Sequence, residues 1–220
     1  MLQAFVTLDD GETTRLSDDG AGATVLRLVP RGDRAVALYL DARMAMLPVH
    51  ARPMSLRGPA LALAEDAVIF VGGPPERGID LTGAMAGKSL FALIATARET
   101  SDFGMATIPV ADEPKHDVPA TWSLYPNGLD PAPMAATTHG TGDAPAWIAR
   151  VRPSERAAGS PRILELGRLD AAGAFTSLGV IATDKRITDI AIAADSFGAV
   201  WILYGDSSAT WLERRVCPPM

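Results

Sequence analysis

Short apolar runs bounded by Gly, Pro, Asp and Ser recur along the whole chain, while the periodicity of amphipathic helices is almost absent. Three of the longer runs carry Ala-Val and end on a segment with Asp or Gly: DRAVALYLDA (33–42), EDAVIFVGGP (65–74) and FGAVWILYGD (197–206). Each follows a shorter run across a turn of a few residues, which is the pattern of a β-hairpin. The pattern predicts an all-β fold in which the second strand of each hairpin, apolar throughout, is buried on both faces.

A third strand with a more alternating pattern follows the first and the last hairpin. These strands are MAMLPVHARP (44–53) and ATWLERRVCP (209–218). A further copy begins with APAWIARVRP (144–153) and continues into a hairpin whose turn is DAAG (170–173), where Gly173 can adopt a positive φ angle. Small antiparallel sheets that repeat and are buried on both faces predict blades that cover one another around an axis.

The last of these units, DIAIAADSFGAVWILY (189–204) with TWLERRV (210–216), resembles a bacterial β-propeller of the WD40-like or Asp-box-like repeat kind. The resemblance implies a propeller-like single domain of about four blades over residues 1–220, and leaves open whether the chain is a partial or truncated propeller. A β-sandwich with the same number of strands is the alternative fold. Residues 110–133, rich in Pro, Asp and Gly, are predicted to form a long loop or insertion.

Residues 210–216 are predicted to form an edge strand, for which the neighbouring sequence supplies no pairing strand on one side. An unpaired strand exposes a row of hydrogen-bonding groups, and propellers usually close by pairing one end of the chain into the blade made by the other. Two spare strands, 2–8 and 13–17, stand near the start of the sequence. We therefore expect one of them to pair beside 210–216; otherwise a second chain or an upstream half completes the ring.

The composition narrows the classes of function. A net charge of −6 and a pI near 5.0, without a cluster of Lys and Arg, argue against nucleic-acid binding. No apolar stretch is long enough for membrane insertion, and the chain as written starts without a signal peptide, so we expect a cytoplasmic protein, or a secreted or periplasmic one if the N-terminus is truncated. The single Cys217 rules out an internal disulfide and a thiolate metal cage. Abundant Arg, Ala, Gly and Pro with scarce Lys are typical of a bacterial protein.

One segment is similar to a phosphate-binding loop. In TGAMAGKS (82–89), Gly87-Lys88-Ser89 follows an apolar run. Such a loop needs a first glycine five residues before the second, so that backbone N–H groups can surround a phosphate, and this position holds Thr82. The segment is therefore predicted to be a turn between blades, and we expect no cofactor.

The histidines do not have the spacing of a zinc site. The chain has three of them, His50, His116 and His139, and none has a second His two to four residues away. His116 stands among Asp112, Glu113 and Asp117. This group is predicted to be a solvated charged loop, with an oxygen-ligated cation site as the alternative. We expect no metal in the protein.

His139 is the candidate for catalysis. It lies in TTHGTGD (137–143) beside Asp143, and with His116 these residues could serve a hydrolase or lyase built on the sheets. The sequence has no G-x-S-x-G motif that would supply a serine nucleophile. Catalysis by His139 requires that a carboxylate and a hydroxyl meet it in one pocket.

The loop-bearing face is the candidate for binding. Trp122, Tyr125 and Asn127 lie in TWSLYPNG (121–128), where aromatic and turn residues together suit contacts with a protein or a sugar. The alternative is a lid that folds onto its own domain. The main functional prediction is a non-enzymatic β-propeller-like scaffold that mediates protein–protein interaction or self-association. The hydrolase or lyase is the alternative function.

Overall fold

The protein is described by a computed structural model that places residues 4–7, 13–17, 22–41, 48–55, 61–71, 76–98, 102–126, 133–138, 144–154, 161–183 and 186–216. Every regular element in these ranges is a β-strand. The described residues contain no helix that is long and apolar enough to cross a membrane. The all-β fold expected from the sequence is confirmed.

The strands form four antiparallel sheets, which are the blades, and one separate hairpin. Blade 1 contains β3 (Ala23–Arg31), β4 (Arg34–Asp41), β5 (Val49–Ser55), β6 (Ala62–Leu63) and β7 (Ala67–Phe70). Blade 2 contains β8 (Glu76–Ala86), β9 (Ser89–Arg98), β10 (Asp102–Val110) and β11 (Thr121–Pro126). Blade 3 contains β12 (Met134–Thr138), β13 (Ala146–Pro153), β14 (Arg162–Leu169) and β15 (Phe175–Thr183). Blade 4 contains β16 (Asp189–Ala194), β17 (Ala199–Gly205) and β18 (Thr210–Val216), and the hairpin is β1 (Phe5–Thr7) with β2 (Thr13–Arg15).

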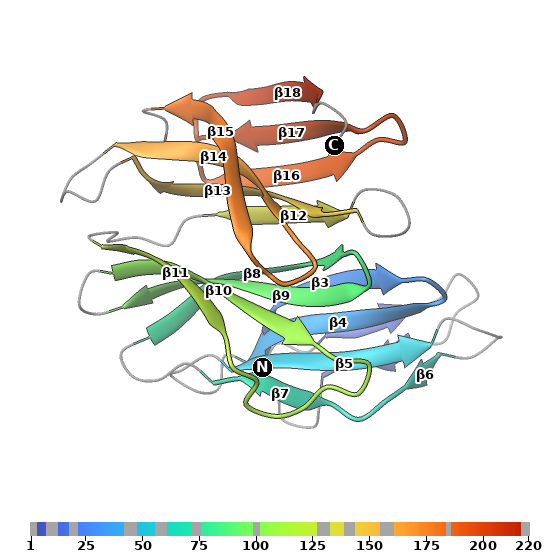
Figure 1. The fold of residues 1–220 in the computed structure, drawn as a ribbon. Coiled ribbons are helices and arrows are strands. Elements are labelled where there is room, and N and C mark those ends of the chain that lie inside the picture. The colour runs from blue at the N-terminus through green and yellow to red at the C-terminus, as the bar shows by residue number, and fades with distance from the viewer. Residues whose placement is uncertain are drawn as a thin grey trace.

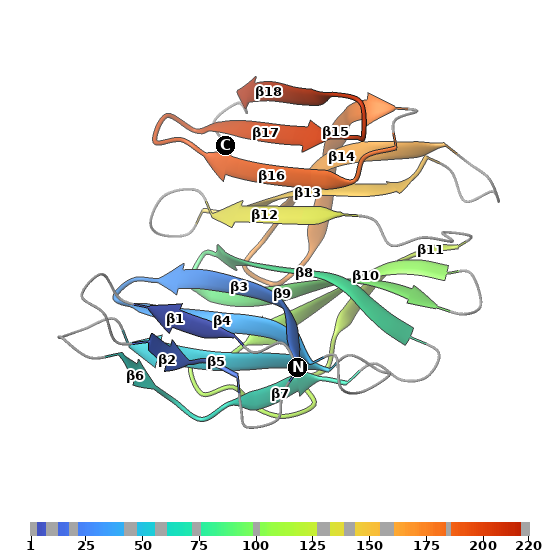
Figure 2. The ribbon, with the colours of Figure 1, turned by 180° about the vertical axis from the view of Figure 1, so that it is seen from behind.

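The blades are arranged as a four-bladed β-propeller (Figure 1). Their first strands, β3, β8, β12 and β16, are neighbours in this order, and the other strands of each blade follow outward. This arrangement confirms the predicted propeller rather than the β-sandwich. In Figures 1 and 2, β8 and β12 lie between β3 and β16. The four blades therefore follow one another in a row, and blades 1 and 4 are the two ends of this row.

The core fills the spaces between neighbouring blades, as two-sided burial predicts. One cluster packs Leu38 and Leu40 of blade 1 against Leu81 and Ile94 of blade 2. The approach is close, because a Cβ atom at Gly83 in β8 would lie 2.5 Å from the Leu38 side chain. A second cluster joins blades 2, 3 and 4, and its members include Phe91, Leu93, Ile148, Leu164, Val200 and Ile202. The sheets therefore bury apolar side chains on both faces wherever two blades meet.

The segment that is similar to a phosphate-binding loop is a hairpin turn. Gly87, with a φ of 59°, and Lys88 connect β8 to β9, whose residues Ala86 and Ser89 pair directly. The Gly87 N–H donates to the carbonyl oxygen of Ala144, 2.8 Å away. The turn lies within blade 2, which corrects the expected turn between blades.

The described parts of the apolar runs at 60–64 and 65–74 do not form a hairpin of their own. β6 pairs with Met54 and Ser55, and β7 pairs with the other end of β5 from Val49 onward, so the two short strands share the outer side of blade 1. The next blade is built from residues 76–126, which the sequence pattern did not single out. The run at 65–74 therefore belongs to the same blade as the run at 33–42. The predicted copy that starts near residue 144 is blade 3, and its Gly173 has a φ of 83°.

Residues 110–133, expected as a long loop, contain β11, the outer strand of blade 2. Residues 111–120 connect it to β10 and return to blade 1. The N–H groups of Asp117 and Val118 donate to the carbonyl oxygens of Val68 and Ile69 at 3.1 and 3.0 Å. The connection of blade 2 thus adds backbone hydrogen bonds to the outer strand of blade 1.

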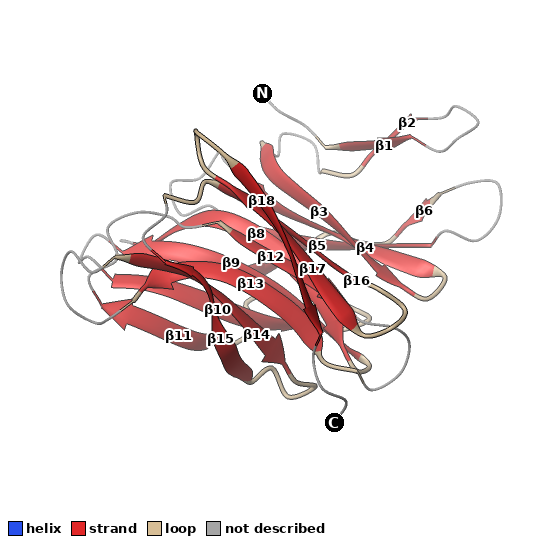
Figure 3. Cartoon of the chain, turned by 90° about the horizontal axis from the view of Figure 1, so that it is seen from above, coloured by secondary structure: helices blue, strands red, loops and turns tan. Residues whose placement is uncertain are grey.

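The start and the end of the described chain do not pair, contrary to the expected closure. β1 pairs with β2, and β18 pairs with β17. Figures 2 and 3 show the β1–β2 hairpin against blade 1, away from β18. Ala4 and Leu16 of the hairpin segment are buried with Tyr39 and Met54 of blade 1, so apolar contact holds the hairpin there.

Candidate functional site

Blade 4 buries one face of its middle strand and exposes the other. In β17, Val200, Ile202 and Tyr204 belong to the core that blades 2 to 4 share. The side chains between them, Trp201 and Leu203, are 37% and 44% exposed. Because side chains alternate between the two faces of a strand, Trp201 and Leu203 lie on the face that points away from blade 3.

The neighbouring strands continue this apolar face. On β18, Leu212 and Val216 are 60% and 66% exposed, whereas Trp211 packs against the core. On β16 the exposed positions are Asp189 at the start of the strand and the small Ala191 and Ala193, while Ile190 and Ile192 pack against the core. The outer face of blade 4 is defined here as Ala191, Ala193, Trp201, Leu203, Leu212, Arg214 and Val216.

Trp201 is held in place by charged neighbours. Its indole N–H donates to Asp195 Oδ2 at 3.1 Å, and the guanidinium carbon of Arg214 lies 5.6 Å from the centre of its ring. Asp195 Oδ1 also accepts the N–H groups of Phe197 and Ala199, both at 2.9 Å, in the turn between β16 and β17. The pKa of Asp195 lies below its ordinary value, mainly because the Ala199 N–H donates to it. The exposed aromatic ring therefore has a fixed orientation.

The outer edge of blade 4 is charged. Blades 2 and 3 have a fourth strand, whereas the described part of blade 4 ends at β18. Glu213 and Arg215 on this strand form an exposed ion pair of 2.6 Å, and the Tyr204 hydroxyl donates to Glu213 at 2.9 Å. Charged side chains on an edge strand discourage uncontrolled pairing with other sheets.

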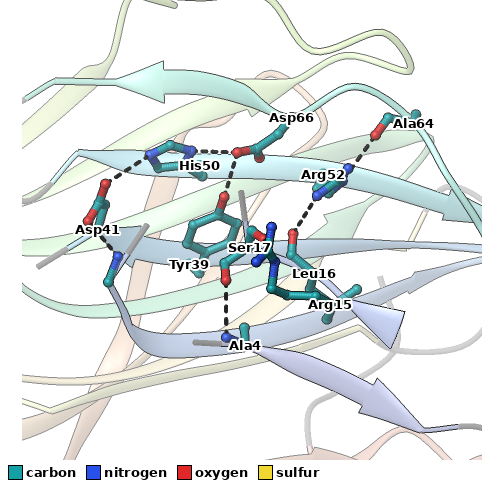
Figure 4. Close-up of polar contacts among 11 residues, drawn as sticks. Ala4, Arg15, Leu16, Ser17, Tyr39, Asp41, His50, Arg52, Ala64 and Asp66 are labelled. Atoms are coloured by element: carbon teal, nitrogen blue, oxygen red, sulfur yellow. Dashed lines mark hydrogen bonds and ion pairs between the residues drawn. The ribbon is translucent and has the colours of Figure 1, made fainter. Parts of the chain in front are cut away.

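The other end of the row, the outward face of blade 1, is covered by the β1–β2 hairpin (Figure 4). Leu16 is fully buried there, and the neighbouring Ser17 accepts the Ala4 N–H at 3.3 Å. Arg52 of β5 donates to the Leu16 carbonyl oxygen at 2.9 Å. Within the described residues, the two ends of the row thus differ: blade 1 is covered and blade 4 is open.

A buried polar cluster lies under this hairpin in blade 1 (Figure 4). Asp66 Oδ2 accepts the Tyr39 hydroxyl at 2.5 Å and lies 2.8 Å from His50 Nδ1. The opposite ring nitrogen of His50 is 4.0 Å from Asp41, which accepts the Gly22 N–H at 3.0 Å. The Tyr39 and His50 rings stack with centroids 4.6 Å apart. The cluster ties β4, β5 and the chain before β3 and β7 together.

The sequence offered little sign of this cluster. His50 stands within an apolar run, far along the chain from Asp66, and only the sheet register brings the two side chains together. An imidazole between two carboxylates can hold or pass a proton. The side chains of His50 and Asp66 are largely buried, however, with exposed fractions of 9% and 2%. The arrangement fits a structural tie better than a reaction centre.

His116, Asp112 and Glu113 line a pocket of about 520 Å³ beside the outer side of blade 1. The pocket also touches Glu65 and Asp66. Asp112 pairs with Arg31 at 2.5 Å, and His116 is exposed, in agreement with a solvated charged loop. Among the described residues, no group of three or more His, Cys, Asp and Glu side chains could hold a metal ion.

The other predicted catalytic residues, His139 and Asp143, lie outside the described residues. The structure therefore does not place them relative to His116, and the catalytic hypothesis stays a prediction. It does place Thr138, whose hydroxyl oxygen accepts the Met85 N–H at 3.0 Å and so joins blade 3 to blade 2.

Of the predicted binding residues, Trp122 lies in β11 and not in a loop. Its ring is tilted against Phe70 of β7 with centroids 5.9 Å apart, and it packs against the core between blades 1 and 2. The backbone of Tyr125 belongs to β11, but its side chain lies outside the described part, as does the whole of Asn127. A binding role for these residues stays a prediction. The outer face of blade 4 was not predicted from the sequence, because an exposed Trp201 in an apolar strand has the same local pattern as a buried aromatic residue.

No protein-family model matches the chain, and no curated protein matches it in sequence. Its fold is similar to that of solved sialidase structures from Trypanosoma rangeli. The complex with the inhibitor DANA gives a TM-score of 0.57 at 12% identity, covering 97% of this chain and 39% of that chain. The complex with 2,3-difluorosialic acid gives 0.55 at 12% identity, covering 96% and 38%. The chain thus spans about two-fifths of the sialidase chain, and at this identity the likeness shows the fold alone.

Proposed function

We propose that this protein is a non-enzymatic scaffold that binds a protein through the outer face of blade 4. One observation carries the proposal: the apolar face of blade 4 is open, while blades elsewhere in the row are covered by a neighbouring blade or, on blade 1, by the β1–β2 hairpin. Contiguous exposed apolar patches on soluble domains mark interaction sites.

The composition of this face supports a protein partner. Trp and Arg are the residues that most often dominate the energy of protein interfaces, and here Trp201 and Arg214 lie side by side. Around them stand the aliphatic side chains of Leu203, Leu212 and Val216. Fully burying one Leu or Val side chain gains about 1.5–3 kcal/mol, so a partner that covers three of them gains enough to offset part of the cost of association.

Rigidity also favours binding here. The ring of Trp201 is fixed by Asp195 and Arg214, so little conformational freedom is lost when a partner covers it. The strands behind it are anchored in the core shared by blades 2 to 4. The face is therefore preorganised for contact.

The test compares the tagged wild-type protein with Leu212→Asp in affinity capture, with Leu28→Asp as the matched control. Leu28 in blade 1 is 49% exposed and Leu212 is 60% exposed, so both substitutions place a carboxylate at an exposed apolar position. We expect Leu212→Asp to lose a partner that Leu28→Asp retains. The partner is then identified, purified and titrated against the three proteins. Equal affinity of the two variants for every purified partner would refute the proposal.

A further inference from the structure

We infer that the partner of the outer face of blade 4 is the same face of a second copy of this chain, docked around a twofold axis that runs along β17. The inference rests on the proposed function, because it names the occupant of that face. Three features of the described residues support it: the covered end of the row, the shape of the face and the placement of its charges.

The covered end of the row decides how two copies can meet. In a head-to-tail arrangement, blade 4 of one copy would contact the outward face of blade 1 of the other copy and so continue the row of blades. That face is occupied by the β1–β2 hairpin, whose Leu16 is fully buried against it. In the described part of each copy, the outer face of blade 4 exposes Trp201, Leu203, Leu212 and Val216, whereas the outward face of blade 1 exposes Leu28 beside the hairpin. Two copies therefore meet through identical faces, which requires a twofold axis.

The shape of the face is self-complementary around such an axis. One row across the strands consists of Ala191, Leu203 and Leu212, and the next consists of Ala193, Trp201 and Arg214. The residues are thus small on β16 and large on β18. A twofold axis along β17 places the small side of one copy against the large side of the other, so that side chains of the two sheets interdigitate.

The charges on the face are complementary in the same arrangement. The rotation brings Arg214 of one copy over Ala193 of the other, next to the turn that begins at Asp195. Asp195 is partly exposed, and its depressed pKa keeps it ionised near neutral pH. Each Arg214 thus approaches an Asp195 carboxylate of the other copy, and the two contacts form symmetrically. Opposite charges at the border of an interface fix its register.

The size of the face predicts a weak dimer. Three strands of six or seven residues, with the usual strand spacing and rise, cover roughly 300 Å² of projected area, so that two copies bury about 1,000 Å² of accessible surface. This area lies at the lower limit of specific interfaces. We expect dissociation in the micromolar range.

The first test measures the mass of the purified chain by sedimentation equilibrium over a range of concentrations. We expect a monomer–dimer equilibrium for the wild type and for Leu28→Asp, and a monomer for Leu203→Asp, with far-UV circular dichroism to show that each variant is folded. Leu212→Asp serves as the second variant if Leu203→Asp does not fold. A wild type that remains monomeric, a dimer that both variants retain, or assembly beyond the dimer would overturn the inference. A monomeric wild type would leave the proposed function standing, provided that a different purified protein binds blade 4.

The second test checks the axis. In a Cys217→Ser background, Ala191→Cys and Leu212→Cys are each made in separate chains, and a bismaleimide that spans roughly 8 Å is added, because packed sheets lie about 10 Å apart. We expect cross-linked dimers when the two variants are mixed, and little cross-linking of either variant alone. Cross-linking of Leu212→Cys with itself at the level of the mixture would overturn the proposed axis.

Discussion

A buried ion cluster in blade 3 gives the sharpest test of the energetics. Glu165 in β14 is 2% exposed and accepts hydrogen bonds from Arg150 at 3.0 Å and Arg152 at 2.9 Å. The Ser177 hydroxyl donates to it at 2.7 Å, and the guanidinium of Arg150 lies 3.8 Å from the centre of the Phe175 ring. One carboxylate therefore joins three neighbouring strands of the blade.

Removing this carboxylate breaks a buried ion pair. In Glu165→Ala, Arg150, whose side chain is 4% exposed, keeps its charge and loses the ion pair with Glu165. Breaking one side of a buried ion pair costs about 3–5 kcal/mol. The matched control is Glu213→Ala, which removes an exposed pair with Arg215 and the hydrogen bond from the Tyr204 hydroxyl and should cost about 1–2 kcal/mol in total. The measurement is urea unfolding followed by tryptophan fluorescence at neutral pH.

The pH dependence of the unfolding free energy gives a second test of the Glu165 cluster. Burial by itself raises the pKa of Glu165, but hydrogen bonds from Arg152 and Ser177 and the charge of Arg150 outweigh burial, so that the pKa lies below its ordinary value. A carboxyl group with a depressed folded-state pKa contributes stability above its unfolded-state pKa and loses it as the pH falls through the folded-state pKa. The difference in unfolding free energy between the wild type and Glu165→Gln should therefore shrink as the solution is acidified. A difference that grows toward acid pH, or a Glu165→Ala cost no larger than that of Glu213→Ala, would refute the reasoning.

Three further predictions concern the packing of the hairpin, a close strand contact and a turn. Leu16→Ala should destabilise the protein by about 2–5 kcal/mol because Leu16 is fully buried between the hairpin and blade 1, and equal melting temperatures for Leu16→Ala and the exposed Leu28→Ala would contradict this packing. Gly167→Ala should cost about 1–3 kcal/mol in urea unfolding, because the new Cβ would meet the Phe175 ring and lie 2.8 Å from the Thr176 carbonyl oxygen; an unchanged midpoint would show that β15 yields freely. Asp195→Ala should both destabilise the protein and shift the fluorescence of Trp201, whereas Asp170→Ala, which removes the same pair of turn hydrogen bonds between β14 and β15, should leave that fluorescence unchanged; identical spectra for the two variants would exclude the Asp195–Trp201 contact.

The sequence predicted the parts of the fold that depend on neighbouring residues. Alternation and turn residues located the hairpins of blades 1, 3 and 4, since a strand and the turn that follows it are encoded locally. Blade 2 was not predicted, because SLFALIATA (89–97) is an apolar run without alternation. A fully buried strand and a buried helix can both have this pattern. The two short strands of blade 1 were mistaken for a hairpin because their real partner, β5, pairs with each of them separately.

The candidate site was harder to predict than the fold. Whether Trp201 faces a neighbouring blade or an open surface depends on which blade is last in the row, and no local pattern carries that information. The same holds for the hairpin at the start of the chain, whose short strands could pair with any free edge. Its docking on blade 1 is decided by the burial of Leu16 beside Tyr39, a contact between side chains distant in sequence.

The return of residues 111–120 to blade 1 has a consequence for how the chain can fold during synthesis. The backbone groups of Val68 and Ile69 obtain their partners only when Asp117 and Val118 have left the ribosome, about fifty residues later. The first blade therefore stays unfinished until the second is nearly complete, and the two become protected from solvent exchange together. Slow amide exchange at Asp117 and Val118 would accordingly report on the opening of blade 1, although these residues belong to the connection of blade 2.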